Sequence, residues 1–330
     1  MLLIPGSIKK DLKLVEKKLG FYANKTAGIL PGVRGLILNG GKRIRPSLLL
    51  LSYRLFKGLK GNGTLKTAVD SATVVELLHA ASLLHDDVIE GAKLRRGTKT
   101  LNASMGDKTA VLVGDLLSTF SSQIVSETQN FEVLKRISRA STLICEGEIE
   151  DVVNSYNLRM TEKKYIGLVL KKTAALFEAC SEIGGVAAGT SAANIRALRS
   201  YGRNLGIAFQ IVDDILDYTA EVREIGKPVL SDLAEGKITL PIIYVLKKAG
   251  PSDRKRIVLI VNDLKAKKHA TEGTMREVKA VLMRYDCITL SYKTAMKYAD
   301  GAIRALRKLP DNEFKLALKE IASFVIRREY

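Results

Sequence analysis

Apolar residues recur at spacings of three and four along most of this 330-residue chain. Long segments rich in Leu, Ala, Ile and Lys carry the pattern, whereas runs of alternating β-branched residues are few. Side chains three and four positions apart lie on one face of an α-helix, and these residue types favour helices. The pattern therefore predicts an all-α protein.

No segment rich in Pro, Gly and Ser separates these helices, and no low-complexity tract divides the chain. Length alone would suggest about two domains. Because sequence motifs run from Gly40 almost to the C-terminus, we expect a single domain over residues 1–330. A more polar, basic stretch from Pro251 to Arg276 is expected to form a peripheral helical excursion.

Two acidic clusters stand out, each at the end of an apolar, helix-compatible stretch. The first reads D-D-V-I-E, and the second, more than a hundred residues later, reads D-D-I-L-D. Positions i and i+4 share a helix face, so Asp86 pairs with Glu90 and Asp213 with Asp217. Mg²⁺ is usually held by one or two carboxylates, with waters and substrate phosphates as its other ligands. Two such pairs suggest a diphosphate bound through bridging Mg²⁺ ions.

A single acidic cluster on a helix is more often a solvated face or a set of partners for lysine. Here Ser82–Leu84 precede the first cluster and Ile207–Val212 precede the second, so both clusters follow helix faces of buried composition. Carboxylates beside buried faces are costly unless a cation pairs with them. This context favours metal binding over a solvated face.

The order of short motifs along the chain resembles that of the polyprenyl synthetase family, the trans-type isoprenyl diphosphate synthases. The resemblance covers nearly the whole chain, and it implies an isoprenoid-synthase-type helical bundle around a deep central cavity. It also implies a prenyltransferase that uses Mg²⁺ to join isopentenyl diphosphate head to tail to an allylic diphosphate. The motifs that carry it are G-G-K-R-I-R-P at 40–46, E-L-L-H-A-A-S-L-L-H-D-D at 76–87, R-R-G at 95–97, G-D at 114–115, K-T-A-A-L-F at 172–177, Q-I-V-D-D-I-L-D at 210–217, G-K-P at 226–228, S-D-L at 231–233 and G-K-I-T-L-P at 236–241.

The resemblance implies roles for individual residues at each substrate. The implied metal ligands are Asp86, Asp87, Glu90, Asp213 and Asp217. The residues implied to bind isopentenyl diphosphate are Lys42, Arg45, His79 and Arg96. Those implied to contact the allylic diphosphate or its carbon chain are Arg95, Lys172, Thr173, Gln210, Lys227 and Lys237. The implied catalytic residues are Asp86, Asp87, Asp213, Lys172, Thr173 and Gln210.

His79 lies seven residues before Asp86, so it projects from nearly the same helix face two turns away. A lone histidine on an apolar helix is more often a core residue, but the resemblance groups this one with the diphosphate-binding cations. Cations aimed at the departing diphosphate lower the barrier to breaking the allylic C–O bond. In the family mechanism the departing diphosphate is the base, so no catalytic histidine or serine is needed.

Three positions depart from the family pattern. Glu90 stands where Asp is usual, and its longer side chain is expected to loosen the metal geometry without abolishing activity. Leu230 replaces a usual glycine, and if that glycine has a positive φ, the loop is expected to be rearranged here. Lys99 stands where proline is common. None of these changes removes a ligand, which argues against a non-catalytic partner subunit.

The composition is strongly basic, with 53 Lys and Arg against 35 Asp and Glu. Such a charge is typical of nucleic-acid binding and also attracts anionic lipid. Many of these cations fall in motifs implied to bind diphosphate, so we expect no nucleic-acid partner, while loose membrane association through a lipid product stays open. The three cysteines are scattered, and the N-terminus lacks the pattern of a signal peptide. We expect a cytoplasmic protein, and the resemblance implies a homodimer.

Ser82 and Ala81 lie four and five residues before Asp86, about one turn deeper along the helix. A hydrocarbon tail growing away from the metal site would pass them, and in the resembling family an aromatic near this level stops growth. Small residues here favour a product longer than geranylgeranyl diphosphate. Alternatively they only allow close helix packing, and Phe120 closes the tunnel of a geranylgeranyl diphosphate synthase. A terpene cyclase, the other alternative, would need no pocket for a second diphosphate.

Overall fold

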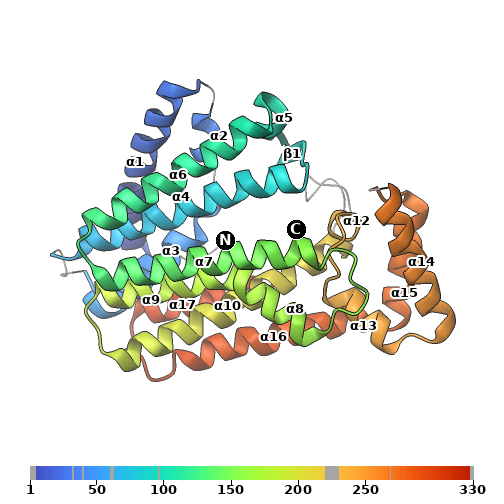
Figure 1. Cartoon of the computed structure of the whole chain (residues 1–330). Coiled ribbons are helices and arrows are strands. Elements are labelled where there is room, and N and C mark those ends of the chain that lie inside the picture. Colours follow the sequence, from blue (N-terminus) through green and yellow to red (C-terminus); the bar gives the residue numbers. More distant parts are fainter. Residues whose placement is uncertain are drawn as a thin grey trace. The chain divides into compact units, whose positions relative to one another are not determined.

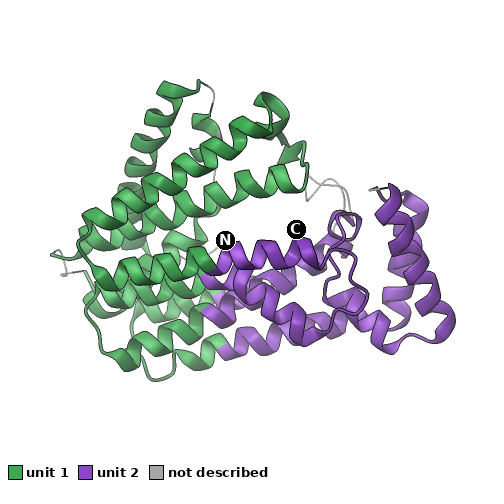
Figure 2. Cartoon of the chain, viewed as in Figure 1, with its two compact units in different colours: residues 1–142, 176–202, 302–321 green, residues 143–175, 203–301, 322–330 purple. Residues whose placement is uncertain are grey.

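The chain is largely helical in the part that the computed structural model describes, which is residues 5–31, 33–38, 41–59, 63–95, 97–219, 230–267 and 269–327. The expected all-α class is confirmed (Figure 1). Within those ranges the strands are limited to one antiparallel hairpin of β1 (Leu94–Arg95) with β2 (Thr98–Lys99). The helices divide into two compact units, each built from separate segments of the chain (Figure 2).

Unit 1 contains residues 1–142, 176–202 and 302–321. Its core helix is α4, which packs against α6 and also contacts α1 and α3. The α4 residues from Ala68 to Leu77 are all buried, since most of them are apolar or small on every face of the helix. The first seven helices begin in this unit and are α1 (Gly6–Ile29), α2 (Arg34–Leu38), α3 (Ile44–Lys57), α4 (Leu65–Ile89), α5 (Leu101–Met105), α6 (Asp107–Glu127) and α7 (Phe131–Val153).

The length and composition of α4 would also allow it to cross a membrane, and no other helix of the described segments meets that test. However, 67% of its most apolar window is buried inside the structure. This degree of burial is typical of a core helix, whose apolar faces are covered by neighbouring helices.

Unit 2 contains residues 143–175, 203–301 and 322–330. In it α8, η1 and the start of α9 follow one another without a break, so a π turn interrupts one long helix. The Thr161 hydroxyl caps this long helix by accepting a hydrogen bond from the Lys164 N–H. The remaining helices of the described residues, some of which run through both units, are α8 (Glu162–Val169), η1 (Leu170–Ala174), α9 (Ala175–Ala187), α10 (Ala192–Thr219), α12 (Ser231–Ala234), α13 (Leu240–Lys248), α14 (Pro251–Lys267), α15 (Glu272–Arg284), α16 (Cys287–Ala305) and α17 (Glu313–Ile326).

The basic stretch after Pro251 forms the helices α14 and α15, which lie at the edge of unit 2 (Figure 2). Their contacts are with each other and with α13, and α14 also contacts α12. The expectation of helices in this stretch is confirmed, and α15 continues to Arg284, beyond the predicted end.

The two units are interleaved in sequence. Helices α7, α10, α16 and α17 each begin in one unit and end in the other. No contiguous half of the chain supplies either unit, so a single domain over residues 1–330 stays our prediction.

Candidate active site

The first acidic cluster lies at the C-terminal end of α4, in unit 1. Helical hydrogen bonding reaches the last residue of the cluster, since the Glu90 N–H donates to the Asp86 carbonyl at 2.8 Å. The two residues are therefore one turn apart, as their spacing predicted. Both side chains are half-buried, whereas Asp87 between them is only 4% exposed.

Asp87 forms an ion pair with Arg95 at the end of β1. The Arg95 Nε donates to Asp87 Oδ1 at 2.8 Å, and Asn102 Nδ2 donates to the Asp87 carbonyl at 3.0 Å. These contacts hold the strand hairpin and α5 against the end of α4. Arg95, implied to bind the allylic diphosphate, is thus placed beside the first acidic cluster. Arg96 lies outside the described residues.

Arg45 and His79, both implied ligands of isopentenyl diphosphate, are brought together in unit 1. Arg45 Nη1 lies 3.0 Å from His79 Nε2, and the guanidinium carbon lies 4.9 Å from the centre of the Phe177 ring. The imidazole and the aromatic face orient a planar guanidinium, the group that binds phosphate oxygens in pairs. Lys42 is exposed just before α3 begins.

Arg43 has a structural role that sequence reasoning missed. Its backbone is left-handed, with φ 48°, at the start of α3. Its guanidinium contacts Glu16 of α1 and Glu76 of α4, each at 2.6 Å. These ion pairs fix the basic segment that carries Lys42 and Arg45 to two other helices.

The second acidic cluster lies near the end of α10, in unit 2. Asp217 is buried, and its carboxylate accepts hydrogen bonds from the Ser231 N–H at 3.1 Å, the Ser231 hydroxyl at 2.9 Å and the Asp232 N–H at 3.3 Å. It therefore caps α12, whose first N–H groups have no helical partners. Burial raises the pKa of Asp217 well above its usual range, and the charge of Asp232 raises it further. Asp213 is half-buried, so it is the more accessible of the two implied ligands.

The loop expected to be rearranged lies outside the described residues up to position 229, and the described chain resumes at Leu230. Leu230 adopts φ 63° and ψ 25°, the left-handed conformation that a glycine would take most easily. Its N–H donates to the Asp217 carbonyl at 3.0 Å, and its side chain is fully buried. Burying a leucine contributes about 1.5–3 kcal/mol, which offsets the roughly 1–2 kcal/mol cost of left-handed backbone.

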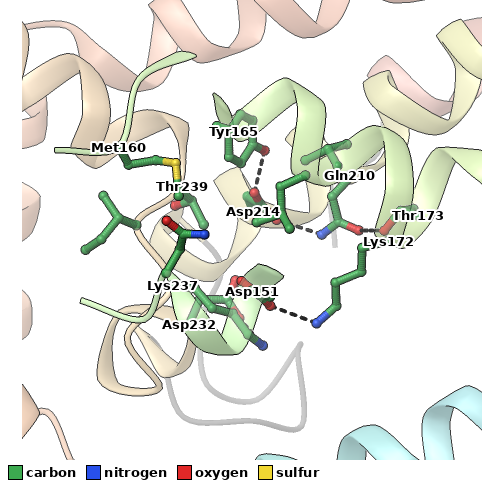
Figure 3. Close-up of a pocket in the computed structure, with 14 residues that line it drawn as sticks. Asp151, Met160, Tyr165, Lys172, Thr173, Gln210, Asp214, Asp232, Lys237 and Thr239 are labelled. Atoms are coloured by element: carbon green, nitrogen blue, oxygen red, sulfur yellow. Dashed lines mark hydrogen bonds and ion pairs between the residues drawn. The ribbon is translucent and has the colours of Figure 1, made fainter. Parts of the chain in front are cut away.

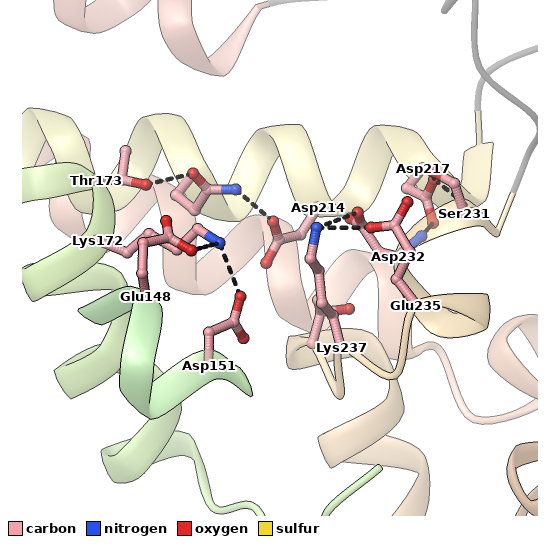
Figure 4. A network of polar contacts seen from close by, with 12 residues as sticks. Glu148, Asp151, Lys172, Thr173, Asp214, Asp217, Ser231, Asp232, Glu235 and Lys237 are labelled. Atoms are coloured by element: carbon pink, nitrogen blue, oxygen red, sulfur yellow. Dashed lines mark hydrogen bonds and ion pairs between the residues drawn. The ribbon is translucent and has the colours of Figure 1, made fainter. Parts of the chain in front are cut away.

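Lys172 lies in the π turn η1, where its ammonium group contacts two carboxylates of α7. Lys172 Nζ is 2.8 Å from Glu148 Oε2 and 2.8 Å from Asp151 Oδ2 (Figure 4). The close approach of α7 depends on Gly147, which is buried against the backbone of the π turn. π turns are rare in proteins as a whole, and those that occur often lie at functional sites.

Thr173 and Gln210 are hydrogen-bonded to each other, and the contact continues to two further side chains (Figure 3). The Thr173 hydroxyl donates to Gln210 Oε1 at 2.7 Å, and Gln210 Nε2 donates to Asp214 Oδ1 at 2.7 Å. The other carboxylate oxygen of Asp214 accepts the hydroxyl of Tyr165. This series of bonds joins α8, η1 and α10.

These side chains line a pocket of about 90 Å³ in unit 2. Lys237, from the segment after α12, also lines it, and its Nζ lies 2.7 Å from Glu235 Oε2 (Figure 4). Lys227 lies outside the described residues. The structure therefore gathers four of the residues implied for the allylic substrate around one pocket, namely Lys172, Thr173, Gln210 and Lys237.

Carboxylates crowd this pocket. Burial raises the pKa of Asp214 to about 8, and the negative charge of Asp232 adds to the effect, while hydrogen bonds from Tyr165 and Gln210 oppose it. A bound cation would relieve this repulsion. Among the described residues, no three or more His, Cys, Asp or Glu side chains form a metal-binding group.

Sequence reasoning also missed Tyr165 and the two acidic partners of Lys172. The i, i+4 spacing of Gln210 and Asp214 could have indicated a contact between them. The distance of eight residues between Tyr165 and Thr173 gave no such indication, since on a regular helix these side chains would diverge by ~80°.

Ala81 and Ser82, the two residues predicted to affect the length of the product, lie on α4. Ala81 is buried, and the Ser82 hydroxyl donates to the His79 carbonyl at 3.0 Å. Phe120 of α6 is also buried, and its ring centre lies 5.1 Å from that of Tyr22 on α1. These contacts do not test the length of the product, which stays a prediction.

The chain matches the family model described as polyprenyl synthetase over residues 32–279. The octaprenyl diphosphate synthase of Haemophilus influenzae is 34% identical over 327 residues, which are 99% of this chain and 92% of that protein. The solved decaprenyl diphosphate synthase from Rhodobacter capsulatus has a TM-score of 0.88 and 35% identity over 98% of both chains. The solved geranylgeranyl pyrophosphate synthetase from Pyrococcus horikoshii has a TM-score of 0.82 and 32% identity over 98% of this chain and 97% of that one.

Fold, motif order and site residues together define a trans-prenyltransferase. The chain belongs to the polyprenyl synthetase family, and the resemblance stated from its motifs is confirmed. It is a polyprenyl diphosphate synthase.

Proposed function

We propose that this protein extends an allylic diphosphate with isopentenyl diphosphate units, in the presence of Mg²⁺, to an all-trans polyprenyl diphosphate longer than geranylgeranyl. The observation that carries the reaction is the pocket in unit 2, where two lysines and the Thr173–Gln210 pair meet. Lysines bind phosphate oxygens, and neutral oxygens suit an allylic cation.

In unit 2, Lys172 and Lys237 bind the allylic diphosphate. Each ammonium group already lies within 2.8 Å of a carboxylate, so its charge is compensated and its position is fixed before substrate binds. The diphosphate oxygens gain negative charge during C–O cleavage. They then bind these ammonium groups in place of the carboxylates or beside them, which stabilises the transition state. Thr173 and Gln210 present oxygen atoms to the carbon that becomes positive.

In unit 1, Arg45 and His79 bind isopentenyl diphosphate. Phe177 and His79 hold the Arg45 guanidinium in one orientation, so little side-chain entropy is lost when it binds two phosphate oxygens. Lys42, which is exposed, and Arg96 complete this group of cations.

The donor set for Mg²⁺ is carboxylate in both units, which is the chemistry that this ion prefers. When bound, the ion neutralises charge on the leaving diphosphate. Asp86 and Asp213 are the principal ligands, since Asp87 and Asp217 already hold Arg95 and α12. Glu90, one turn from Asp86, is the second ligand in its cluster. A polyprenyl synthase from Caulobacter crescentus, 32% identical over 98% of this chain, was solved with calcium and isoprenyl diphosphate.

The proposal of a long product is supported by Ala81 and Ser82, which place small side chains on α4 one turn before Asp86. A geranylgeranyl diphosphate synthase is the second candidate, because a relative of that name from Sulfolobus acidocaldarius is 33% identical over 302 residues. The assembly that we propose is a cytoplasmic homodimer, with loose membrane association only through its lipid product.

Incubation of the pure protein with Mg²⁺, isopentenyl diphosphate and a farnesyl or geranylgeranyl primer tests this function. We expect products with more than four isoprene units, and none when EDTA removes the metal. Products that end at geranylgeranyl would select the second candidate. No product at all would indicate a chain that needs another subunit.

A further inference from the structure

A continuous series of hydrogen bonds, buried at one end and part-buried at the other, runs along the lining of the unit 2 pocket (Figure 3). It starts at Tyr165, passes through Asp214 and Gln210, and finishes at Thr173. Tyr165 and Asp214 are only 3% and 4% exposed, so water does not compete for the contact between them.

We infer that Tyr165 and Asp214 are positioning residues that fix the direction of the Thr173 hydroxyl. In this arrangement the Thr173 proton points to Gln210, and the lone pairs of its oxygen face the pocket. The inference rests on the proposed function, in which an allylic cation forms beside Thr173.

The direction follows from which atoms donate and which accept. When the Asp214 carboxyl is ionised, the form that a cation bound at the neighbouring Asp213 would favour, both of its oxygens accept, one from the Tyr165 hydroxyl and the other from the Gln210 amide N–H. The amide of Gln210 therefore turns its carbonyl oxygen to Thr173, and a carbonyl oxygen only accepts. Thr173 must donate, because its hydroxyl carries one hydrogen and two lone pairs.

The opposite orientation of the Thr173 O–H bond would destabilise the developing allylic cation. If the Thr173 hydrogen pointed into the pocket, the positive end of the O–H dipole would face the developing cation. With the proton held by Gln210, the negative end faces it instead, and no reorganisation is needed when charge appears. The residues at the far end of the series thus act on catalysis through Thr173.

The π turn makes this series possible. Tyr165 and Thr173 are eight residues apart, and on a regular α-helix their side chains would diverge by ~80°. The turn at Leu170–Ala174 closes over one more residue than an α turn, so it advances each residue by a smaller angle. Tyr165 and Thr173 consequently both reach α10, at Asp214 and Gln210, which are one turn apart.

Tyr165→Phe removes one hydroxyl and tests the inference. We expect kcat to fall about tenfold while KM for each diphosphate changes less than about twofold, since the contact acts on the transition state. The matched control is Tyr201→Phe, which removes the hydroxyl of another fully buried tyrosine, bonded to the Leu318 carbonyl at 2.7 Å in unit 1. The control should lower thermal stability to a similar extent and leave kcat unchanged.

A double-mutant cycle with Thr173→Val separates positioning from a general structural effect. If Tyr165 acts through the Thr173 hydroxyl, then Tyr165→Phe causes no further loss of kcat once that hydroxyl is absent. Additive losses, or a kcat for Tyr165→Phe equal to that of Tyr201→Phe, overturn the inference. If Tyr165→Phe loses helical circular dichroism, Asp214→Ala takes its place in the cycle and removes the acceptor instead of the donor. A wild-type protein that makes no product overturns the proposed function and the inference together, whereas an active wild type with additive losses overturns the inference alone.

Discussion

Gly147 of α7 lies against the backbone of Lys172, so that a Cβ at Gly147 would be 2.6 Å from the Lys172 nitrogen. No side chain fits in that space. Because the nearest atoms are backbone atoms of Lys171 and Lys172, a larger residue at 147 must move either α7 or the π turn.

Gly147→Ala is therefore expected to displace the π turn and with it Lys172 and Thr173. We expect kcat to fall at least tenfold and stability to fall by about 1–3 kcal/mol, the usual cost of overpacking. Gly167→Ala in α8 is the matched control, since a Cβ there would meet nothing within 4 Å, and it should be neutral or stabilise by about 0.5–1 kcal/mol. Steady-state kinetics and thermal unfolding measure both variants, and unchanged kcat in Gly147→Ala would contradict the steric argument.

Removing a principal metal ligand should abolish most turnover. Asp86→Ala or Asp213→Ala is expected to lower kcat by about a hundredfold or more with helical circular dichroism unchanged, since the metal supplies several kcal/mol of transition-state stabilisation. Glu90→Asp should be tolerated or increase Mg²⁺ affinity. Asp263→Ala, an exposed ion-pair partner of Lys267 on α14, is the control and should leave the Mg²⁺ dependence of the rate unaltered. Near-normal turnover in either cluster variant would refute the assignment of ligands.

The two diphosphates should respond to different cations. Arg45→Ala is expected to raise KM for isopentenyl diphosphate about ten- to a hundredfold, the loss of one charge-assisted hydrogen bond. Lys237→Ala, and likewise Lys227→Ala, should raise KM for the allylic substrate by a similar factor. Each variant should change the other KM little. Equal changes in both constants, measured by varying one substrate at saturation of the other, would show that the roles are assigned wrongly.

The left-handed backbone at Leu230 should reverse the usual order of stability between alanine and glycine variants. Leu230→Gly is expected to be about 1 kcal/mol more stable than Leu230→Ala, although it removes more side chain, because glycine accepts positive φ without strain. Leu233 in α12 is equally buried but helical, so there glycine should be less stable than alanine by about 1 kcal/mol. Urea unfolding of the four variants gives both differences, and the same order at both positions would argue against strain at Leu230.

Product length should respond to the level of Ala81. Ala81→Phe is expected to shorten the product by several isoprene units, because the ring fills volume that the tail would occupy. Phe120→Ala tests the alternative, since a longer product from that variant would show that Phe120 closes the tunnel. If Ala81→Phe leaves the product distribution of the wild type unchanged, Ala81 does not line the path of the tail.

Helix content and the i, i+4 pairs within each acidic cluster could be predicted because they depend on local spacing, whereas the grouping of the site residues came from the family resemblance. The three-and-four pattern gives helices, and the turn between Asp86 and Glu90 follows from 3.6 residues per turn. The partners of these residues depend on segments distant in sequence, which spacing does not reveal. The cap that Asp217, an implied metal ligand, provides for α12 could not be read from spacing, and neither could the ion pairs of Arg43 with Glu16 and Glu76.

The π turn was equally beyond prediction. Leu170–Ala174 has an ordinary helical composition, so its residues do not distinguish a π turn from an α turn. Leu230 shows the opposite case, because the missing glycine was visible but its consequence was not. Whether a left-handed leucine is tolerated depends on the burial of its side chain, and only the folded structure shows that burial.

The interleaving of the two units constrains how this protein is made in the cell. Unit 1 needs residues 302–321 for its last segment, and unit 2 needs residues 322–330. Synthesis must therefore pass residue 302 before unit 1 can be complete and residue 322 before unit 2 can be complete, so shorter nascent chains lack part of the helix packing of both units. Truncation near the C-terminus should consequently affect both units, and limited proteolysis of the native protein should yield no stable half.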